Sequence, residues 1–350
     1  MTMVSQQFSY VIGVDTHAKT HTLVALDHLG GKHGTAQTFP TTPPGLKRAQ
    51  AWIERETTGP VLVAMEGTGS YGAQFCDLLT AAGVRVTETR PPKRGVRRAG
   101  KTDPIDAEHA ARYALALPME HLITPRNHAG HHAALTVLLT ARAALKKAHS
   151  ASNNRLTALL RGYGFGLDVR LALTAEQVKV VAAWRAHRND DVGMVTIRAE
   201  AAREAREILS RQAELTANEK GLLKHVKALA PYLLLEHGVG AIVAAQLIVS
   251  WSHQGRIRSE AAFARFAGIA PIPASSGNTI RYRLHRGGDR ALNTAIWVTT
   301  FYRYHHDPAT AAYVEKRTKE GKTPKEIQRV LKRYIARHLF RVLDNHTILA

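Results

Sequence analysis

Apolar and polar positions in the first 120 residues follow two different periods. Short apolar runs and apolar/polar alternation predict strands at about residues 9–15, 21–27, 33–39, 61–66 and 84–88. Apolar residues at helical spacing predict helices at about residues 44–56, 71–82 and 103–117. Three strands joined by short turns, followed by alternating helices and strands, predict an α/β domain with a mixed sheet over residues 1–120.

The pattern becomes mainly helical after residue 120. Residues 121–230 are rich in Ala, Glu, Lys and Arg, with a glycine-rich break at residues 162–166. Apolar residues then recur every seven positions, at Ile208, Leu215, Leu222 and Leu229. This spacing predicts a helical hairpin or coiled-coil connector, which is also a natural place for self-association. Residues 231–350 are predicted to form a second, mainly α-helical domain.

The charge of the chain indicates a polyanionic partner. The 350 residues contain 48 Lys and Arg against 28 Asp and Glu, a formal net charge of +20. Residues 251–350 contain 18 Lys and Arg against 7 Asp and Glu, so much of the excess lies there. Nucleic acid is the first candidate partner, and an anionic membrane surface is the second.

Other features of the sequence predict a soluble protein of a reducing cytoplasm. The amino terminus has no basic segment followed by an apolar stretch, so we expect no signal peptide. The longest apolar tract, residues 241–251, is too short to span a bilayer and contains Gln246 and Ser250. A single cysteine, Cys76, excludes an internal disulfide and a cysteine-based zinc site.

Four acidic residues lie where predicted elements begin or end. Asp15 and Glu66 each end a predicted strand, and Asp103 and Asp106 open the helix at 103–117. The last two are three residues apart, so on a helix they share a face. Carboxylates gathered at one sheet edge repel one another unless a divalent cation lies between them. The arrangement predicts a Mg2+ or Mn2+ site on a ribonuclease-H-like fold.

Each of these acidic residues has a simpler explanation when it is taken alone. Asp15 and Glu66 are compatible with turns, and Asp103 and Asp106 are compatible with a helix cap and first-turn charge. The metal site is favoured because all four occupy the points that such a fold requires.

Three segments are candidates for contact with a nucleic acid backbone. The loop before residue 103 is basic, two glycines precede the helical run at 241–249, and a second basic segment follows a Pro- and Gly-rich loop at 267–278. A solvated loop and a plain tight turn are simpler explanations of the same segments. The candidate contact residues are Arg94, Arg97, Arg98, Lys101, Gly238, Gly240, Arg281, Arg283, Arg286 and Arg290.

The Pro- and Gly-rich loop also contains a candidate nucleophile. Ser275 and Ser276 precede Gly277, and the cations that follow would lower the pKa of a hydroxyl and bind phosphate. A serine in a loop is more often a turn residue, and the composition alone favours that explanation.

The joint order of these motifs resembles the transposases of the insertion sequence 110 family, relatives of the Piv and MooV invertases. The resemblance extends over nearly the whole chain. The matching segments are Ile12-Gly-Val-Asp15, Met65-Glu-Gly-Thr-Gly69, Lys101-Thr-Asp-Pro-Ile-Asp-Ala107, Gly238-Val-Gly240, and Phe266-Ala-Gly-Ile-Ala-Pro271 through Ser276-Gly277 to Gly287-Gly288 and Leu292.

The resemblance implies a RuvC-like domain whose Asp15, Glu66, Asp103 and Asp106 bind Mg2+ or Mn2+, and a carboxyl-terminal domain whose nucleophile is Ser276. It implies cut-and-paste movement or site-specific recombination of an insertion element through a covalent phosphoserine. The implied partners are donor DNA, target DNA, an element-encoded bridge RNA and further copies in a homodimer or homotetramer. The implied location is the bacterial cytoplasm, at the nucleoid when the protein is active, with no membrane partner.

Three other functions are compatible with parts of the sequence. A RuvC-like nuclease would use metal-activated water and no serine. An actin-like or sugar-kinase-type phosphotransferase is suggested by Gly13-Val-Asp-Thr16 and Glu66-Gly-Thr-Gly69, which resemble nucleotide phosphate loops. The basicity of the chain and the Asp103/Asp106 pair argue against a kinase. A nucleic-acid-binding module without catalysis would bind normally after loss of the acidic residues.

Overall fold

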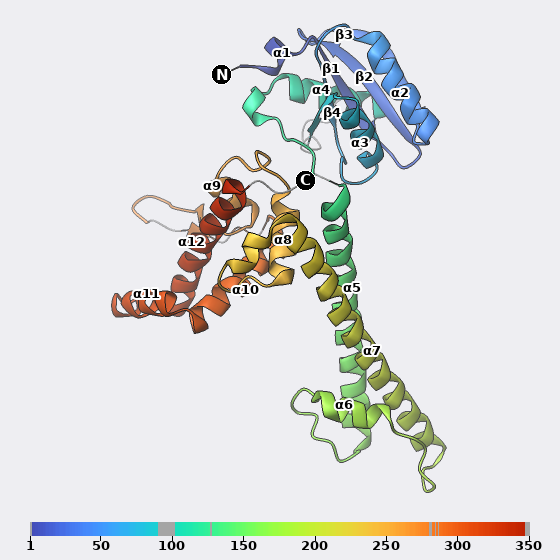
Figure 1. Ribbon diagram of the computed structural model, residues 1–350, viewed down its shortest axis with the longest axis vertical. Helices are drawn as coiled ribbons and strands as arrows, with labels where there is room; N and C mark the ends of the chain where they lie inside the picture. The colour runs from blue at the N-terminus through green and yellow to red at the C-terminus, as the bar shows by residue number, and fades with distance from the viewer. Residues whose placement is uncertain are drawn as a thin grey trace. The chain divides into compact units, whose positions relative to one another are not determined.

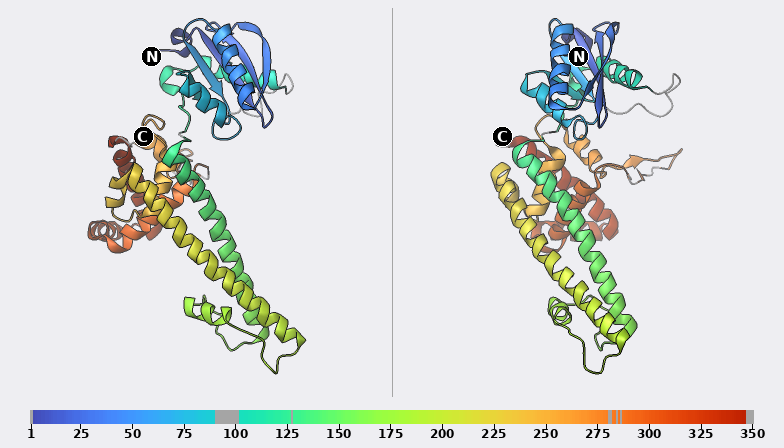
Figure 2. Two further views of the ribbon diagram at one scale, coloured as in Figure 1. Left: turned by 45° about the vertical axis from the view of Figure 1, so that its right-hand side comes forward. Right: turned by 90° about the vertical axis from the view of Figure 1, so that its right-hand side faces the viewer.

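The chain folds into two compact units, residues 1–128 and residues 129–350, which are described separately (Figures 1 and 2). The computed structural model describes residues 2–89, 102–126, 128–279, 282–283, 285 and 287–346. The predicted contact residues outside these ranges are Arg94, Arg97, Arg98, Lys101, Arg281 and Arg286.

A five-stranded mixed sheet forms the centre of the first unit (Figure 1). Its strands are β1 (Tyr10–Thr16), β2 (Thr20–Asp27), β3 (Lys32–Pro40), β4 (Val61–Met65) and β5 (Arg85–Glu88). The order across the sheet is β3-β2-β1-β4-β5. Strand β2 is antiparallel to β1 and β3, whereas β4 is parallel to β1 and β5. All five predicted strands and the mixed sheet are therefore confirmed.

Helices cover both faces of this sheet. They are α1 (Val4–Gln7), α2 (Pro43–Glu56), α3 (Ala73–Ala81) and α4 (Asp103–Leu115), followed by the short 3-10 helix η2 (Met119–His121). Because side chains alternate along β1, Ile12 and Val14 pack with α2 and α3, whereas Val11 packs with α4. The strand order and the two covered faces are those of a ribonuclease-H-like α/β domain, as the sequence predicts.

Helix α4 lies directly on strand β1 at Gly13. A Cβ atom at residue 13 would lie 1.8 Å from the carbonyl oxygen of Ala107 and 2.8 Å from the amide nitrogen of Ala111. Both alanines are fully buried. The absence of a side chain at residue 13 and the small side chains of α4 let the two backbones approach, so that the first turn of α4 reaches the carboxyl end of β1.

The second unit begins with a long helical hairpin, as predicted. Helix α5 (Gly130–Tyr163) and helix α7 (Val192–Leu229) contain 34 and 38 residues and pack along each other, with α6 (Ala175–Ala182) between them in the chain (Figure 2). The seven-residue repeat of α7 is buried within this one chain: its members are Ile208, Leu215, Leu222 and Leu229. The repeat is thus an intrachain packing seam, and self-association through the other faces of this hairpin stays a prediction.

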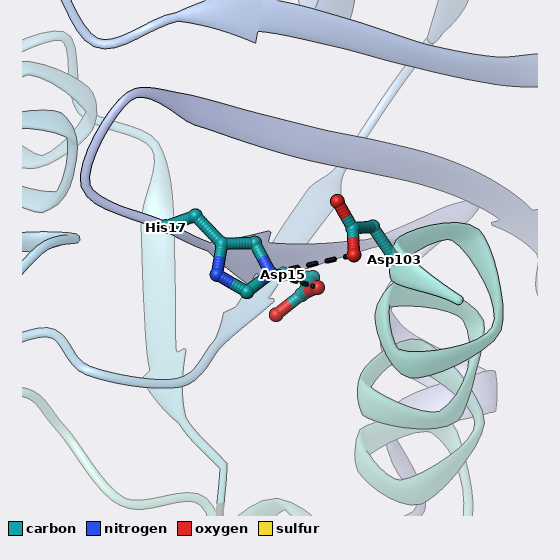
Figure 3. Close-up of side chains that lie close together, drawn as sticks. All are labelled: Asp15, His17 and Asp103. Carbon is teal, nitrogen blue, oxygen red and sulfur yellow. Dashed lines mark hydrogen bonds and ion pairs between the residues drawn. The ribbon is translucent and has the colours of Figure 1, made fainter. Parts of the chain in front are cut away.

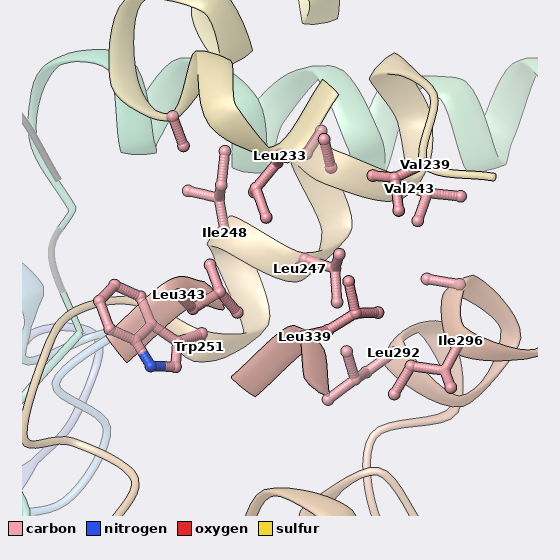
Figure 4. Packing of buried hydrophobic residues seen from close by; sticks show 14 of the residues in the cluster. Leu233, Val239, Val243, Leu247, Ile248, Trp251, Leu292, Ile296, Leu339 and Leu343 are labelled. Carbon is pink, nitrogen blue, oxygen red and sulfur yellow. The ribbon is translucent and has the colours of Figure 1, made fainter. Parts of the chain in front are cut away.

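Helix α8 (Ala241–Trp251) lies in the hydrophobic core of the second unit, and Figure 4 shows its side chains packed with others of that core. The other elements are η3 (Pro231–Leu235), α9 (Glu260–Phe266), β6 (Ile272–Pro273), β7 (Tyr282–Arg283), α10 (Arg290–His306), α11 (Pro308–Lys319) and α12 (Pro324–Asn345). Leu247, Leu292 and Leu339 meet in the core. This part is mainly helical, as predicted. Among the described residues, no helix has the length and low polarity that crossing a membrane requires.

The contact at Gly13 predicts a clear stability effect. Gly13→Ala should destabilise the first unit by about 1–3 kcal/mol, because the added methyl group forces α4 away from β1. Hydrogen exchange of the α4 amides, followed by mass spectrometry, should become faster. Gly162→Ala is the control, since a Cβ there meets no atom within 4 Å. Unchanged α4 protection in Gly13→Ala would contradict the packing argument.

Candidate functional site

The register of the central strands places two of the predicted acidic residues next to each other. Val14 of β1 pairs with Met65 of β4 in a parallel ladder, and Asp15 and Glu66 are the next residues on each strand. Alternation places Asp15 on the same side of β1 as Gly13, which is the side that α4 covers. Because α4 begins at Asp103, its first-turn carboxylates come to this edge of the sheet.

Asp15, Asp103 and a histidine form a compact cluster at this edge (Figure 3). The Nε2 atom of His17 lies 3.0 Å from Oδ2 of Asp15 and 3.4 Å from Oδ1 of Asp103. Figure 3 shows the imidazole ring reaching toward both carboxylates. His17 was not among the predicted site residues. The sequence does contain a signal for His17: it lies two residues after Asp15, so in an extended chain both side chains are on the same side.

The electrostatics of Asp15 show that like charges gather here. Burial raises the pKa of Asp15 above its ordinary value of 3.8, and the carboxylates of Asp103 and Asp106 raise it further. The neighbouring His17 lowers this pKa in part. A bound divalent cation would remove the repulsion, so this donor set fits a metal site. Carboxylate oxygens are ligands for Mg2+ and Mn2+, whereas imidazole nitrogen is a poor ligand for Mg2+.

The other two predicted acidic residues are not members of the three-residue cluster. Asp106 lies one turn along α4 from Asp103, near enough for its charge to act on Asp15. Glu66 directly follows β4, and its main-chain carbonyl accepts a hydrogen bond of 3.1 Å from Oγ1 of Thr16. The structure thus brings Asp15 and Asp103 together with His17, and it places Glu66 and Asp106 on the elements that form the same edge.

Ser276 lies in the turn of the short β6–β7 hairpin. Its amide donates to the carbonyl of Thr279, and the amide of Thr279 donates to the carbonyl of Ser276, at 3.2 and 3.1 Å. Gly277 has a φ of 54° in this turn, a conformation that favours glycine. Ser275 and Ser276 are both exposed. Ser276 is therefore a turn residue, and the turn presents its hydroxyl to solvent.

Two glycines hold together the segments that precede and follow this hairpin. A Cβ atom on Gly288 would lie 2.4 Å from the carbonyl oxygen of Phe266, and one on Gly268 would lie 2.6 Å from that of Gly287. The amide of Asp289 donates to the Phe266 carbonyl at 2.7 Å. This backbone contact gives the base of the hairpin a defined geometry.

The glycines before α8 differ in their surroundings. Gly238 packs against α10, where a Cβ would lie 3.1 Å from the ring of Tyr302, and Arg303 donates to the adjacent carbonyl of His237 at 2.8 Å. Gly240 is the N-cap of α8, makes no side-chain cap and faces open space. Of these two glycines, only Gly240 lies in open space, where a phosphate could reach the first amides of α8. The remaining described contact residues are Arg283 in β7 and Arg290 at the start of α10.

The chain is similar to transposases in both units. Residues 12–165 match a family model described as "Transposase", for the DEDD transposases of the IS110 type. Residues 232–315 match a second model, described as "Transposase IS116/IS110/IS902 family". The chain is also 33% identical over 120 residues to the insertion element IS110 uncharacterized 43.6 kDa protein of Streptomyces coelicolor. That match covers 34% of this chain and 30% of the relative, so it spans less than a third of the relative's length.

The raised pKa of Asp15 predicts how the metal-free protein responds to mutation. A carboxyl group whose pKa is raised by folding favours the folded state below its ordinary pKa, and this contribution is lost as the pH rises through the raised value. Asp15→Asn should therefore raise the unfolding midpoint at pH 7 in EDTA, with the gain shrinking under acidic conditions. Mn2+ should raise the midpoint of the unaltered protein but not that of Asp15→Asn.

Asp77→Asn is the matched control for this experiment, because Asp77 is an exposed carboxylate in α3 of the same unit. Its midpoint should respond to Mn2+ as that of the unaltered protein does. An equal rise in the midpoint of Asp15→Asn with Mn2+ would mean that the ion binds elsewhere.

Proposed function

Because the chain belongs to the IS116/IS110/IS902 family of transposases, we propose that it moves an insertion sequence by cutting and rejoining DNA. The observation that carries this proposal is the cluster of Asp15, His17 and Asp103 at the sheet edge of the domain that the transposase model matches. The net charge of +20 supports a DNA substrate. The substrate class is thus a phosphodiester in duplex DNA.

The acidic residues are proposed to hold Mg2+ or Mn2+ on the scissile phosphate. Asp15 and Asp103 already lie together, and Glu66 and Asp106 come from the elements beside them. A bound ion would offset the charge that develops on the phosphate oxygens. Asp15 and Asp103 would position the ion. In the absence of the ion, the hydrogen bond between His17 and Asp15 fixes the orientation of the Asp15 carboxylate.

Ser276 is proposed to act as the nucleophile. Its Oγ atom attacks phosphorus, a P–O bond to serine forms, and the P–O bond to one DNA strand breaks. The serine proton passes to solvent, and the leaving DNA oxygen takes up a proton. A free hydroxyl of another DNA end then attacks the phosphoserine, which releases Ser276 and joins the new partner. The exposed turn supports this role because it allows a phosphate to approach the hydroxyl.

The proposed partners follow from the same reaction. Donor and target DNA supply the two strands, and an element-encoded bridge RNA would select them. Arg283, Arg290 and the open amides after Gly240 are proposed contacts to nucleic acid backbones. Exchange between two duplexes needs at least two copies of the chain, so we propose a homodimer or homotetramer.

A RuvC-like hydrolase that uses water is the second candidate. It is favoured by one observation. No described side chain forms a hydrogen bond with Oγ of Ser276, so none is placed to act as the general base that would remove the proton of this hydroxyl. A serine hydroxyl is a weak nucleophile at neutral pH without such help. The two candidates differ in whether a covalent adduct forms.

The metal site predicts the behaviour of four variants. Asp15→Asn, Glu66→Gln, Asp103→Asn and Asp106→Asn should each reduce strand cleavage at least about 100-fold, since each removes a charge that the cation needs. DNA and RNA binding should be retained, because none of these changes empties a core. Cleavage of labelled DNA in Mg2+ and in Mn2+ measures the effect, with Asp77→Asn as the control. Full activity in two or more of the four would refute this assignment.

The serine assignment predicts a covalent product at a single residue. Denaturing gels should show a protein–DNA adduct, and peptide mapping should place it on Ser276. Ser276→Ala should bind DNA and metal without forming the adduct, whereas Ser275→Ala should retain it. DNA found on Ser275 would shift the assignment by one residue. Continued cleavage by Ser276→Ala without any adduct would support the hydrolase instead.

A further inference from the structure

A pocket of about 340 Å³ lies beside the base of the serine hairpin. Its walls are the turn that follows α9, strand β7 and one face of α12. Pockets of this size are large enough for a small organic ligand. The nucleic acid contacts predicted from the sequence include no residue of α12, so this pocket adds a surface to them.

The charge of the pocket is positive. Arg329, Arg333 and Arg337 are spaced four residues apart on α12 and line it together with Arg283 of β7. Arg337 is hydrogen-bonded to Glu260, whereas Arg329 and Arg333 are exposed and form no ion pair with any described residue. None of the described residues that line the pocket is acidic. Two guanidinium groups are thus left for an anionic ligand.

The pocket also presents aromatic and apolar surfaces. The phenol rings of Tyr282 and Tyr334 line it, and these residues are 65% and 52% exposed. The ring of Tyr313 meets that of Tyr334 at 89°, with centroids 6.2 Å apart, and this contact orients the second ring. Ile269 and Val330 add apolar surface. Flat apolar surfaces beside unpaired guanidinium groups suit a planar aromatic ligand that carries phosphate.

We propose that this pocket binds one unpaired nucleotide of a nucleic acid strand. The base stacks on Tyr334 or Tyr282, and its phosphates are bound by Arg329 and Arg333. A duplex does not fit this chemistry, since its bases are stacked on each other and the faces of the tyrosine rings would find no partner. The nucleotide belongs to either a DNA strand or an RNA strand, because both carry the same base and phosphate groups.

The position of the pocket connects it to the proposed reaction. Tyr282 pairs with Pro273 in the hairpin, and Ser276 lies three residues beyond Pro273. At about 3.3 Å per extended residue, Ser276 lies ~10 Å along the chain from that pair. If Ser276 is the nucleophile, the bound nucleotide would lie within a few nucleotides of the phosphate that Ser276 attacks. This part of the inference rests on the proposed function.

Binding of short oligonucleotides tests the pocket without any dependence on catalysis. Fluorescence anisotropy of the full chain in EDTA would compare an eight-residue single-stranded DNA, the RNA of the same sequence and a longer duplex DNA. Tyr334→Ala and Arg333→Ala should each weaken single-strand binding about tenfold, with less than a twofold effect on the duplex. The strand type that shows the larger loss identifies the source of the nucleotide.

Two matched variants separate stacking and local charge from general effects. Tyr334→Phe keeps the ring and should restore single-strand binding. Lys325→Ala removes one exposed cation from the same helix outside the pocket, and it should weaken single-strand and duplex binding equally. The proposal is overturned if Tyr334→Ala weakens duplex binding as much as single-strand binding, or if Tyr334→Phe fails to restore it. Adduct formation on Ser276 would then still stand as a separate result.

Discussion

The close approach of helix α4 to strand β1 at Gly13 is the contact on which the proposed metal site depends. A side chain at residue 13 would meet the backbone of Ala107, so glycine is what lets the two elements touch. Because α4 begins at Asp103, this contact brings a helix terminus to the strand end that carries Asp15. Burial first, and then the charges of Asp103 and Asp106, raise the pKa of Asp15, so a cation bound at this edge of the sheet would stabilise its carboxylate.

The second unit uses the same device for a different purpose. Gly268 and Gly288 bring two backbone segments into contact, and the hairpin with Ser276 extends from between them. The long helices that precede it bury their seven-residue repeat against their own chain and continue into the core that Trp251 and Leu339 help to fill. Close backbone packing therefore positions both the elements that carry the acidic cluster and the hairpin that carries Ser276.

The sequence predicted the elements well because strand alternation, helix periodicity and the acidic residues at element ends are local signals. It places Asp15 and Asp103 at such ends, and these two residues lie together in the structure. It missed His17, whose position beside both carboxylates depends on where α4 packs. The seven-residue repeat of α7 indicates a packing seam, but a sequence pattern does not say which helix covers it, and here α5 of the same chain does. The pocket on α12 is not predicted from the sequence because α12 follows the segments of its other walls by more than forty residues.

In the proposed reaction, DNA strands are exchanged through two successive displacements at phosphorus. Each in-line displacement inverts the configuration of the phosphorus atom, so two restore it. The most direct test uses a DNA substrate with a phosphorothioate of one known configuration at the scissile position, and determines the configuration in the rejoined product. A reaction through phosphoserine predicts retention of configuration. Inversion would contradict it, since a single displacement by water or by a DNA hydroxyl leaves no place for a phosphoserine.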